Sequence, residues 1–146
     1  RTNGTASHLA CYHSMDIALD TAPYNGTTTT CEALWMGVPV TTKVGDRHMA
    51  RVGASLLTAV GHPEWIAASD EEYVAHAIAL ASSAENLSQI RSGLRSDLER
   101  SPLLDRAGQA SRFGTALREC WKKWCVEQSS GRTANAANLS SSVLLA

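Results

Sequence analysis

The chain has 146 residues, of which 44% are hydrophobic and 18% are charged, and its formal net charge is −1 at pH 7. This composition predicts one globular domain with a core, and it excludes a disordered chain and an electrostatic nucleic-acid binder. No apolar run approaches the ~20 residues of a transmembrane helix, so we expect no membrane partner and a cytoplasmic location.

The four cysteines, Cys11, Cys31, Cys120 and Cys125, have no CxxC spacing and no paired histidines near them. Zinc sites need such clustered ligands, so this pattern argues against one. Reduced thiols in a cytosolic protein are the simplest interpretation. We therefore expect no metal and no other cofactor.

The first elements follow a strand–helix–strand order. Residues 15–20 are an apolar strand, residues 28–36 a helix and residues 38–43 a second strand. Gly37 ends the helix, because glycine is the usual residue after a helical C-terminus. A βαβ unit of this kind predicts a parallel sheet with a right-handed crossover, hence an α/β fold.

The next elements continue the alternation. Residues 47–60 read as a second helix and residues 65–67 as a short strand. Ser69 and Glu72 form a capping box that opens another helix. We expect the apolar face of that helix at Val74, Ala77, Ile78 and Ala81. The helix after it has apolar residues three to four positions apart, at Leu87, Ile90, Leu94 and Leu98.

The last segment begins at Ser101-Pro102 and carries an apolar stripe at Phe113, Leu117, Cys120, Trp121 and Trp124. From Glu127 onward Ser, Gly, Asn and Ala dominate, which predicts a disordered tail over 127–146 and a folded domain over 1–126. Only about three strands are visible, fewer than the five or six of an average sheet. We therefore expect the chain to be a fragment, with further strands upstream.

The most informative stretch joins the first strand to the first helix. The strand runs into a turn that contains Asn25 and Gly26, and four threonines follow at 27–30. The first turn of a helix has unpaired N–H groups and partial positive charge, so it binds anions. Each hydroxyl bond to a phosphate oxygen contributes roughly 1.5–3 kcal/mol. With Glu32 one turn further, placed to accept hydrogen bonds from a ribose diol, the pattern predicts a nucleotide-sugar diphosphate site.

Ordinary explanations exist for each of these residues. Threonine before a helix is usually an N-cap, and a glutamate inside a helix is usually a solvated charge. Two further candidates, His48 and Arg51, follow the second strand, at the end of the sheet where open α/β proteins bind ligands. For them the alternatives are pairing of His48 with Asp46 and a surface position for Arg51.

The strings YNGTTT (residues 24–29) and CEALWMGVP (residues 31–39) resemble the O-linked N-acetylglucosamine transferases, above all their bacterial members and the plant SPINDLY-type relatives. The resemblance covers about residues 7–125. It implies a two-lobed, Rossmann-like glycosyltransferase of the GT-B type, of which this chain is the donor-binding C-terminal lobe.

The resemblance also implies roles for single residues. Thr28 and Thr29 match the pair of threonines that binds the donor diphosphate, and Glu32 matches an acidic residue on the ribose hydroxyls. His8 matches the histidine that packs against the uracil. Thr27 stands where some animal members have a histidine, so its role is less defined.

Other features of the family have no counterpart in this chain. Cys11 replaces an arginine that animal enzymes have near the nucleotide. The lysine that engages the donor phosphates and the residues proposed near the acceptor would lie upstream, with the first lobe and the tetratricopeptide repeats. We therefore expect no catalytic residue here and no sugar transfer by the chain alone.

The function implied by the resemblance is transfer of N-acetylglucosamine from UDP-GlcNAc to Ser or Thr hydroxyls of proteins. Its partners would be the nucleotide-sugar donor, the protein acceptor and the missing lobe. Two alternatives stay open: a protein O-fucosyltransferase that uses GDP-fucose, and a truncated module that binds a nucleotide or a partner without catalysis.

Overall fold

The computed structural model describes residues 4–143, with side chains up to residue 128. The chain divides into two compact units, Arg1–Asp105 and Arg106–Ala146. The first unit holds the sheet and the candidate site, and the second is a single helix.

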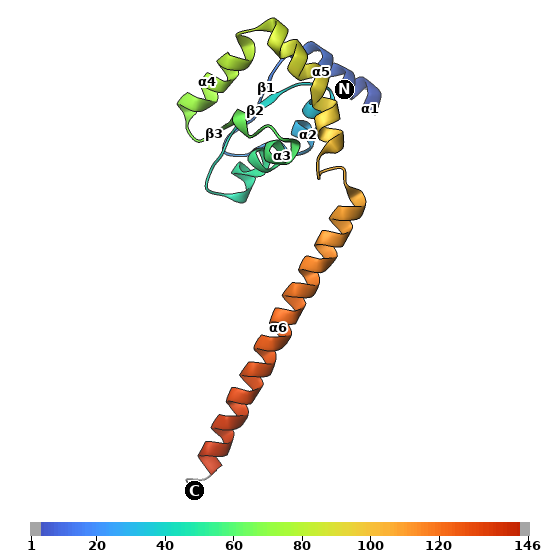
Figure 1. Ribbon diagram of the computed structural model, residues 1–146. Coiled ribbons are helices and arrows are strands. Elements are labelled where there is room, and N and C mark those ends of the chain that lie inside the picture. Colours follow the sequence, from blue (N-terminus) through green and yellow to red (C-terminus); the bar gives the residue numbers. More distant parts are fainter. Residues whose placement is uncertain (1–3, 144–146) are drawn as a thin grey trace. The chain divides into compact units, whose positions relative to one another are not determined.

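The sheet of the first unit is parallel and three-stranded, in the order β1-β2-β3 (Figure 1). Its strands are β1 (Ala18–Leu19), β2 (Val40–Lys43) and β3 (Ile66–Ala67). Ala18 pairs with Val40, and Thr42 pairs with Ile66. The α/β fold with a parallel sheet, expected from the βαβ pattern, is confirmed.

The helices of the first unit alternate with the strands. They are α1 (Thr5–Ala10), α2 (Thr28–Trp35), α3 (Val52–Val60), α4 (Asp70–Ala81) and α5 (Ala84–Arg100). Three 3₁₀ turns lie between them: η1 (Cys11–Ser14), η2 (His48–Ala50) and η3 (Pro63–Trp65). The sequence did not predict α1 or η1, and the helix expected over 47–60 is divided into η2 and α3 at Arg51.

Gly37 ends α2 as expected, for two physical reasons. Its φ angle is +75°, in the left-handed region that other residues avoid. A Cβ atom at this position would also lie 2.7 Å from the backbone oxygen of Arg91 in α5. Glycine here therefore permits both the turn into β2 and the close packing of α5.

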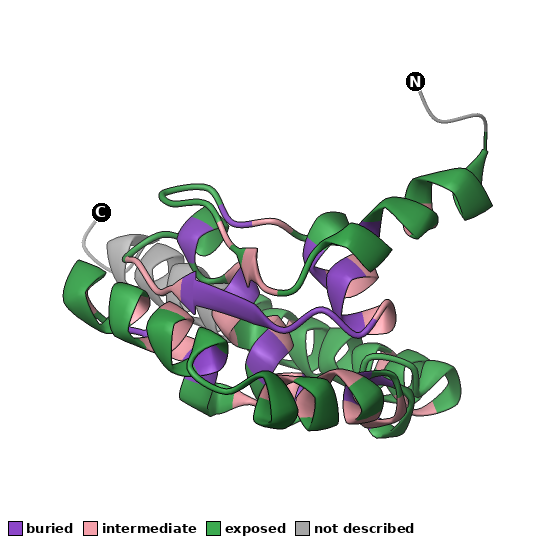
Figure 2. Cartoon of the chain, turned by 90° about the horizontal axis from the view of Figure 1, so that it is seen from above, coloured by how far each residue is buried: buried purple, intermediate pink, exposed green. Residues whose placement is uncertain are grey.

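The core lies between the sheet and the helices around it. Its fully buried side chains include Leu34, Val40, Leu57 and Leu94, from α2, β2, α3 and α5. Figure 2 shows the buried residues gathered along the central strand and on the inward sides of the helices. Each such side chain contributes roughly 1.5–3 kcal/mol by leaving water, so burial holds α2 against the sheet.

Helix α4 begins with the predicted cap, but only part of its apolar face was predicted. The Ser69 hydroxyl accepts a hydrogen bond from the Glu72 amide, and Glu72 Oε2 accepts one from the Ala68 amide at 2.8 Å. Val74 and Ile78 are exposed, at 55% and 64%. Ala77 lies inward as predicted, and the other inward residues are Tyr73, His76 and Leu80. The tertiary hydrogen bond from Tyr73 fixes the rotation of this helix, and periodicity alone does not reveal such a bond.

The second unit is α6 (Arg106–Val143), a helix of 38 residues. The rings of Trp121 and Trp124, both on α6, stack on each other with their centroids 4.9 Å apart. The backbone continues as helix through 127–143, where composition predicts disorder, and residues 144–146 lie outside the described residues. The division into a folded domain over 1–126 and a disordered tail over 127–146 stays a prediction. Among the described helices, none is both long and apolar enough to cross a bilayer.

Candidate functional site

The loop that follows β1 is closed by the carboxylate of Asp20. Its Oδ1 atom accepts hydrogen bonds from the amides of Gly26 at 2.7 Å and Thr21 at 3.0 Å. Its Oδ2 atom accepts a hydrogen bond from the Thr42 hydroxyl of β2, also at 2.7 Å. Asp20 therefore holds loop 20–26 in one shape and ties it to the neighbouring strand. The sequence around Asp20 did not indicate this role in closing the loop.

Asn25 joins this loop to the loop that follows β2. The side chain is 1% exposed; its Nδ2 group donates to the Thr21 carbonyl at 3.0 Å, and its Oδ1 atom accepts from the Gly53 amide at 3.2 Å. The Asn25 amide donates to the Met49 carbonyl at 2.8 Å. Asn25 was a candidate for ligand contact. Both polar groups of its side chain instead bond to the protein backbone, and these bonds position the loop.

Gly26 lets the start of α2 approach the loop closely. A Cβ atom there would lie 2.5 Å from Thr29 Oγ1 and 2.9 Å from Thr30 Oγ1. Thr30 is buried, and its hydroxyl donates to the Gly26 carbonyl at 3.1 Å. Any side chain at Gly26 would therefore displace the threonines of the first helical turn.

The other three threonines leave their hydroxyls unused by the protein. Thr27 is the N-cap residue of α2, but its side chain makes no capping hydrogen bond. Thr27, Thr28 and Thr29 are exposed, and their hydroxyls bond to no other described residue. The ordinary N-cap explanation therefore does not account for Thr27. The start of α2 presents unpaired amides and three hydroxyls together, a set of donors suited to an anion.

Glu32, one turn into α2, is held by two aromatic side chains. Its Oε2 atom lies 2.9 Å from His8 Nε2 and accepts a hydrogen bond from the Tyr12 hydroxyl at the same distance. The hydrogen bonds from His8 and then Tyr12 lower the pKa of Glu32. Burial, followed by the contact with Glu32, raises the pKa of Tyr12 to about 12. Glu32 is therefore a fixed carboxylate rather than a freely solvated charge.

His8 and Tyr12 reach Glu32 from the segment before the first strand. His8 lies on α1, and Tyr12, which is 7% exposed, lies on η1. Their rings meet edge to face with centroids 6.0 Å apart. The structure thus brings His8, Glu32 and the threonines together, and it adds Tyr12, which sequence analysis missed.

His48 and Arg51 lie on the adjacent loop after β2. His48 is exposed in η2, and Arg51 donates from Nη1 to the Gly45 carbonyl at 2.9 Å. Asp46 Oδ1 lies 3.9 Å from Arg47 Nε, and no ion pair or hydrogen bond joins Asp46 to His48, so the alternative explanation for His48 does not apply among the described residues. Arg51 thereby closes the loop after β2. His48 and Arg51 both lie on this loop, which Asn25 joins to the segment before α2.

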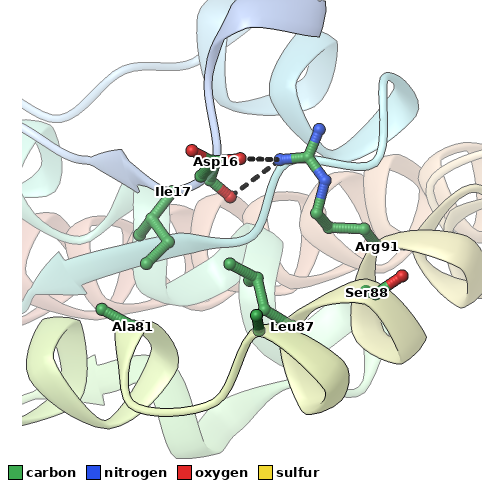
Figure 3. A pocket seen from close by; sticks show the side chains of 7 residues that line it. Asp16, Ile17, Ala81, Leu87, Ser88 and Arg91 are labelled. Carbon is green, nitrogen blue, oxygen red and sulfur yellow. Dashed lines mark hydrogen bonds and ion pairs between the residues drawn. The ribbon is translucent and has the colours of Figure 1, made fainter.

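Two cavities lie near β1 and share no lining residue. One of about 240 Å³ is lined by residues of the candidate site, among them Tyr12, Asp20, Gly26 and Thr29. The other, of about 490 Å³, has apolar walls at Ile17, Ala81 and Leu87, with Arg91 turned toward Asp16 (Figure 3). None of the predicted site residues lines this larger hollow, so volume alone does not identify the site.

The chemistry at the start of α2 is that of an anion site rather than a metal site. Its donors are amides and hydroxyls, and Glu32 is the nearby acceptor. Across the described part of the chain, no group of three or more His, Cys, Asp or Glu side chains converges as metal ligands. The expectation that no metal takes part stays a prediction.

Comparison with known proteins finds a matching family model and relatives with closely related names. The model of glycosyl transferase family 41 matches residues 5–112. A protein of Solanum lycopersicum named probable UDP-N-acetylglucosamine–peptide N-acetylglucosaminyltransferase SPINDLY is 46% identical over 118 residues, which are 81% of this chain and 13% of the relative. A UDP-N-acetylglucosamine–peptide N-acetylglucosaminyltransferase of Caenorhabditis elegans is 33% identical over 109 residues, 75% of this chain and 10% of the relative.

Among solved structures, a mutant O-GlcNAc transferase of Thermobaculum terrenum superposes with a TM-score of 0.74 at 37% identity. The match covers 81% of this chain and 23% of the other. The chain therefore spans a small part of the length of its relatives. Because the family model matches well over half of the chain, the protein belongs to glycosyl transferase family 41.

Proposed function

We propose that this chain is the donor-binding part of a glycosyltransferase that moves N-acetylglucosamine from UDP-GlcNAc to Ser or Thr hydroxyls of proteins. The observation that carries the proposal is the start of α2, where the hydroxyls of Thr27, Thr28 and Thr29 face solvent unused beside the fixed carboxylate of Glu32. The names of the relatives supply the donor and the acceptor class.

The start of α2 would act on the leaving group. In a direct displacement, the acceptor oxygen bonds to the anomeric carbon while the bond from that carbon to the diphosphate oxygen breaks. Negative charge grows on the diphosphate, and donors already in place stabilise it without reorganisation. Thr28, Thr29 and the N–H groups of the first helical turn supply these donors. The proton of the acceptor hydroxyl passes to a base that we expect outside this chain.

We also propose which other parts, partners and cellular location this reaction needs. A second lobe would complete the acceptor side, and a protein would be the acceptor. The location would be cytoplasmic, in keeping with Cys11, Cys31 and Cys120, which form no disulfide among the described residues. Tetratricopeptide repeats elsewhere in the full-length protein also belong to this proposal. We predict that the 146-residue chain alone transfers no sugar.

Calorimetric titration of the chain with UDP, GDP and ADP tests the proposal. Binding of UDP in preference to the other two supports it. Preference for GDP would favour the GDP-fucose alternative, which the names of the relatives do not support. Binding of none of the three would leave the non-catalytic module.

Replacing Glu32 with Gln should weaken the preference for UDP over 2′-deoxy-UDP. The substitution keeps the shape of the side chain but halves its acceptor capacity, so the bond to the ribose hydroxyl loses its charge. We expect the ratio of the two dissociation constants to fall about fivefold, measured by calorimetry. Glu85→Gln, at an exposed position of α5, is the control and should keep the ratio. An unchanged ratio in Glu32→Gln would show that Glu32 does not contact the ribose.

A further inference from the structure

Two donors share a single oxygen of the Glu32 carboxylate. His8 Nε2 and the Tyr12 hydroxyl both lie 2.9 Å from Oε2. No hydrogen bond to Oε1 forms within the described part of the chain. A carboxylate accepts only, so both neighbours must donate, and the bonds leave Oε1 as the free acceptor.

The two donors differ in how firmly they are held. His8 is exposed on α1. Tyr12 is 7% exposed and belongs to the same core cluster as Ala33 and Leu34 of α2. The Tyr12 hydroxyl also lies 3.4 Å from the Thr29 carbonyl, beside the first turn of α2. Because the ring is packed in the core, Tyr12 determines where Oε2 lies.

We propose that Tyr12 is a positioning residue for the ribose of the donor: it fixes Glu32 so that Oε1 alone is presented to one hydroxyl of the sugar. This inference rests on the proposed function, since the ligand must carry a ribose. Preference for ribose over deoxyribose then depends on a tyrosine that need not touch the nucleotide.

Removal of the Tyr12 hydroxyl releases one of the two bonds that orient the carboxylate. In Tyr12→Phe the carboxylate rotates about its terminal bond, and Oε1 is no longer held toward the ligand. The preference for UDP over 2′-deoxy-UDP should fall about threefold to fivefold, the effect of one hydrogen bond to a charged group acting indirectly.

The test compares UDP and 2′-deoxy-UDP binding by calorimetry in wild type, Tyr12→Phe and Tyr73→Phe. Tyr73→Phe is the matched control, because it also removes a part-buried hydroxyl bond, the one to the Asp20 carbonyl at 2.7 Å, but makes no contact with Glu32. A loss of packing or stability alone would change both affinities by the same factor. We expect the ratio to change in Tyr12→Phe and to stay constant in Tyr73→Phe; a constant ratio in both variants overturns the inference.

A second measurement needs no nucleotide. It separates failure of the positioning role of Tyr12 from failure of the proposed function. NMR titration of the Glu32 side chain should show its pKa rise in Tyr12→Phe toward the ordinary value, and His8→Ala, at an exposed site, should also raise it. An unchanged pKa in Tyr12→Phe overturns the positioning role even where UDP binds. If wild type binds no UDP, the proposed function fails, and the ribose role fails with it, whatever the pKa shows.

Discussion

The variant that carries both Thr28→Ala and Thr29→Ala should lose about a hundredfold in affinity for UDP. Each substitution removes one charge-assisted hydrogen bond to the diphosphate, which corresponds to roughly tenfold or ~1.4 kcal/mol. Both side chains are exposed and their hydroxyls bond to no other described residue, so the loss should not come from unfolding. Calorimetry of the double and the two single variants measures the effect.

Thr58→Ala is the control for this prediction, because Thr58 is an exposed threonine on α3. Alanine has a higher helix propensity than threonine, so none of these substitutions should weaken the helices. The control should bind UDP as wild type does. Wild-type affinity in the double variant would exclude the threonines from the diphosphate site.

Asp20→Ala should lower the free energy of unfolding by about 3 kcal/mol. The carboxylate accepts hydrogen bonds from the Gly26 and Thr21 amides and from the Thr42 hydroxyl, and alanine leaves all three donors without it. Each donor that loses its acceptor and is not fully solvated by water lowers the free energy of unfolding by about 1 kcal/mol. Urea denaturation followed by circular dichroism measures the change.

Asp16 provides the comparison, four residues earlier and before the start of β1. Its side chain is 86% exposed, and its carboxylate lies 3.9 Å from Arg91. Exposed pairs of this kind contribute little, so Asp16→Ala should change stability by less than about 1 kcal/mol. Equal effects of the two substitutions would show that Asp20 does not hold the loop.

Local patterns allowed much of the fold to be predicted. The strand–turn–helix order around 15–43 depends on neighbouring residues. The end of α2 at Gly37 is likewise indicated locally, by a glycine directly before Val38-Pro39. The buried stripe of α5 was also predicted, since Leu94 and Leu98 are 0% and 4% exposed. Periodicity predicts such faces wherever one side of a helix is clearly more apolar.

The parts that were missed depend on contacts between distant residues. Both faces of α4 carry apolar residues, and its rotation follows a hydrogen bond from Tyr73 to Asp20, 53 positions away in the chain. Tyr12 reaches Glu32 across 20 positions, and Asp20 reaches Thr42 across 22. The resemblance pointed to the threonines and Glu32 because they stand in specific strings, and to His8 by its matching position. It did not indicate what fixes these residues in place.

The most direct measurement of the central claim is an NMR titration of the chain with UDP, followed through its backbone amides. If the diphosphate binds at the start of α2, the largest shifts should fall on the amides of Thr28, Thr29 and Thr30, with smaller ones near His8 and Glu32. The amides around Ile17 and Arg91, at the other hollow, should stay in place. Saturable shifts confined to that other hollow, or no shifts at millimolar UDP, would contradict the account.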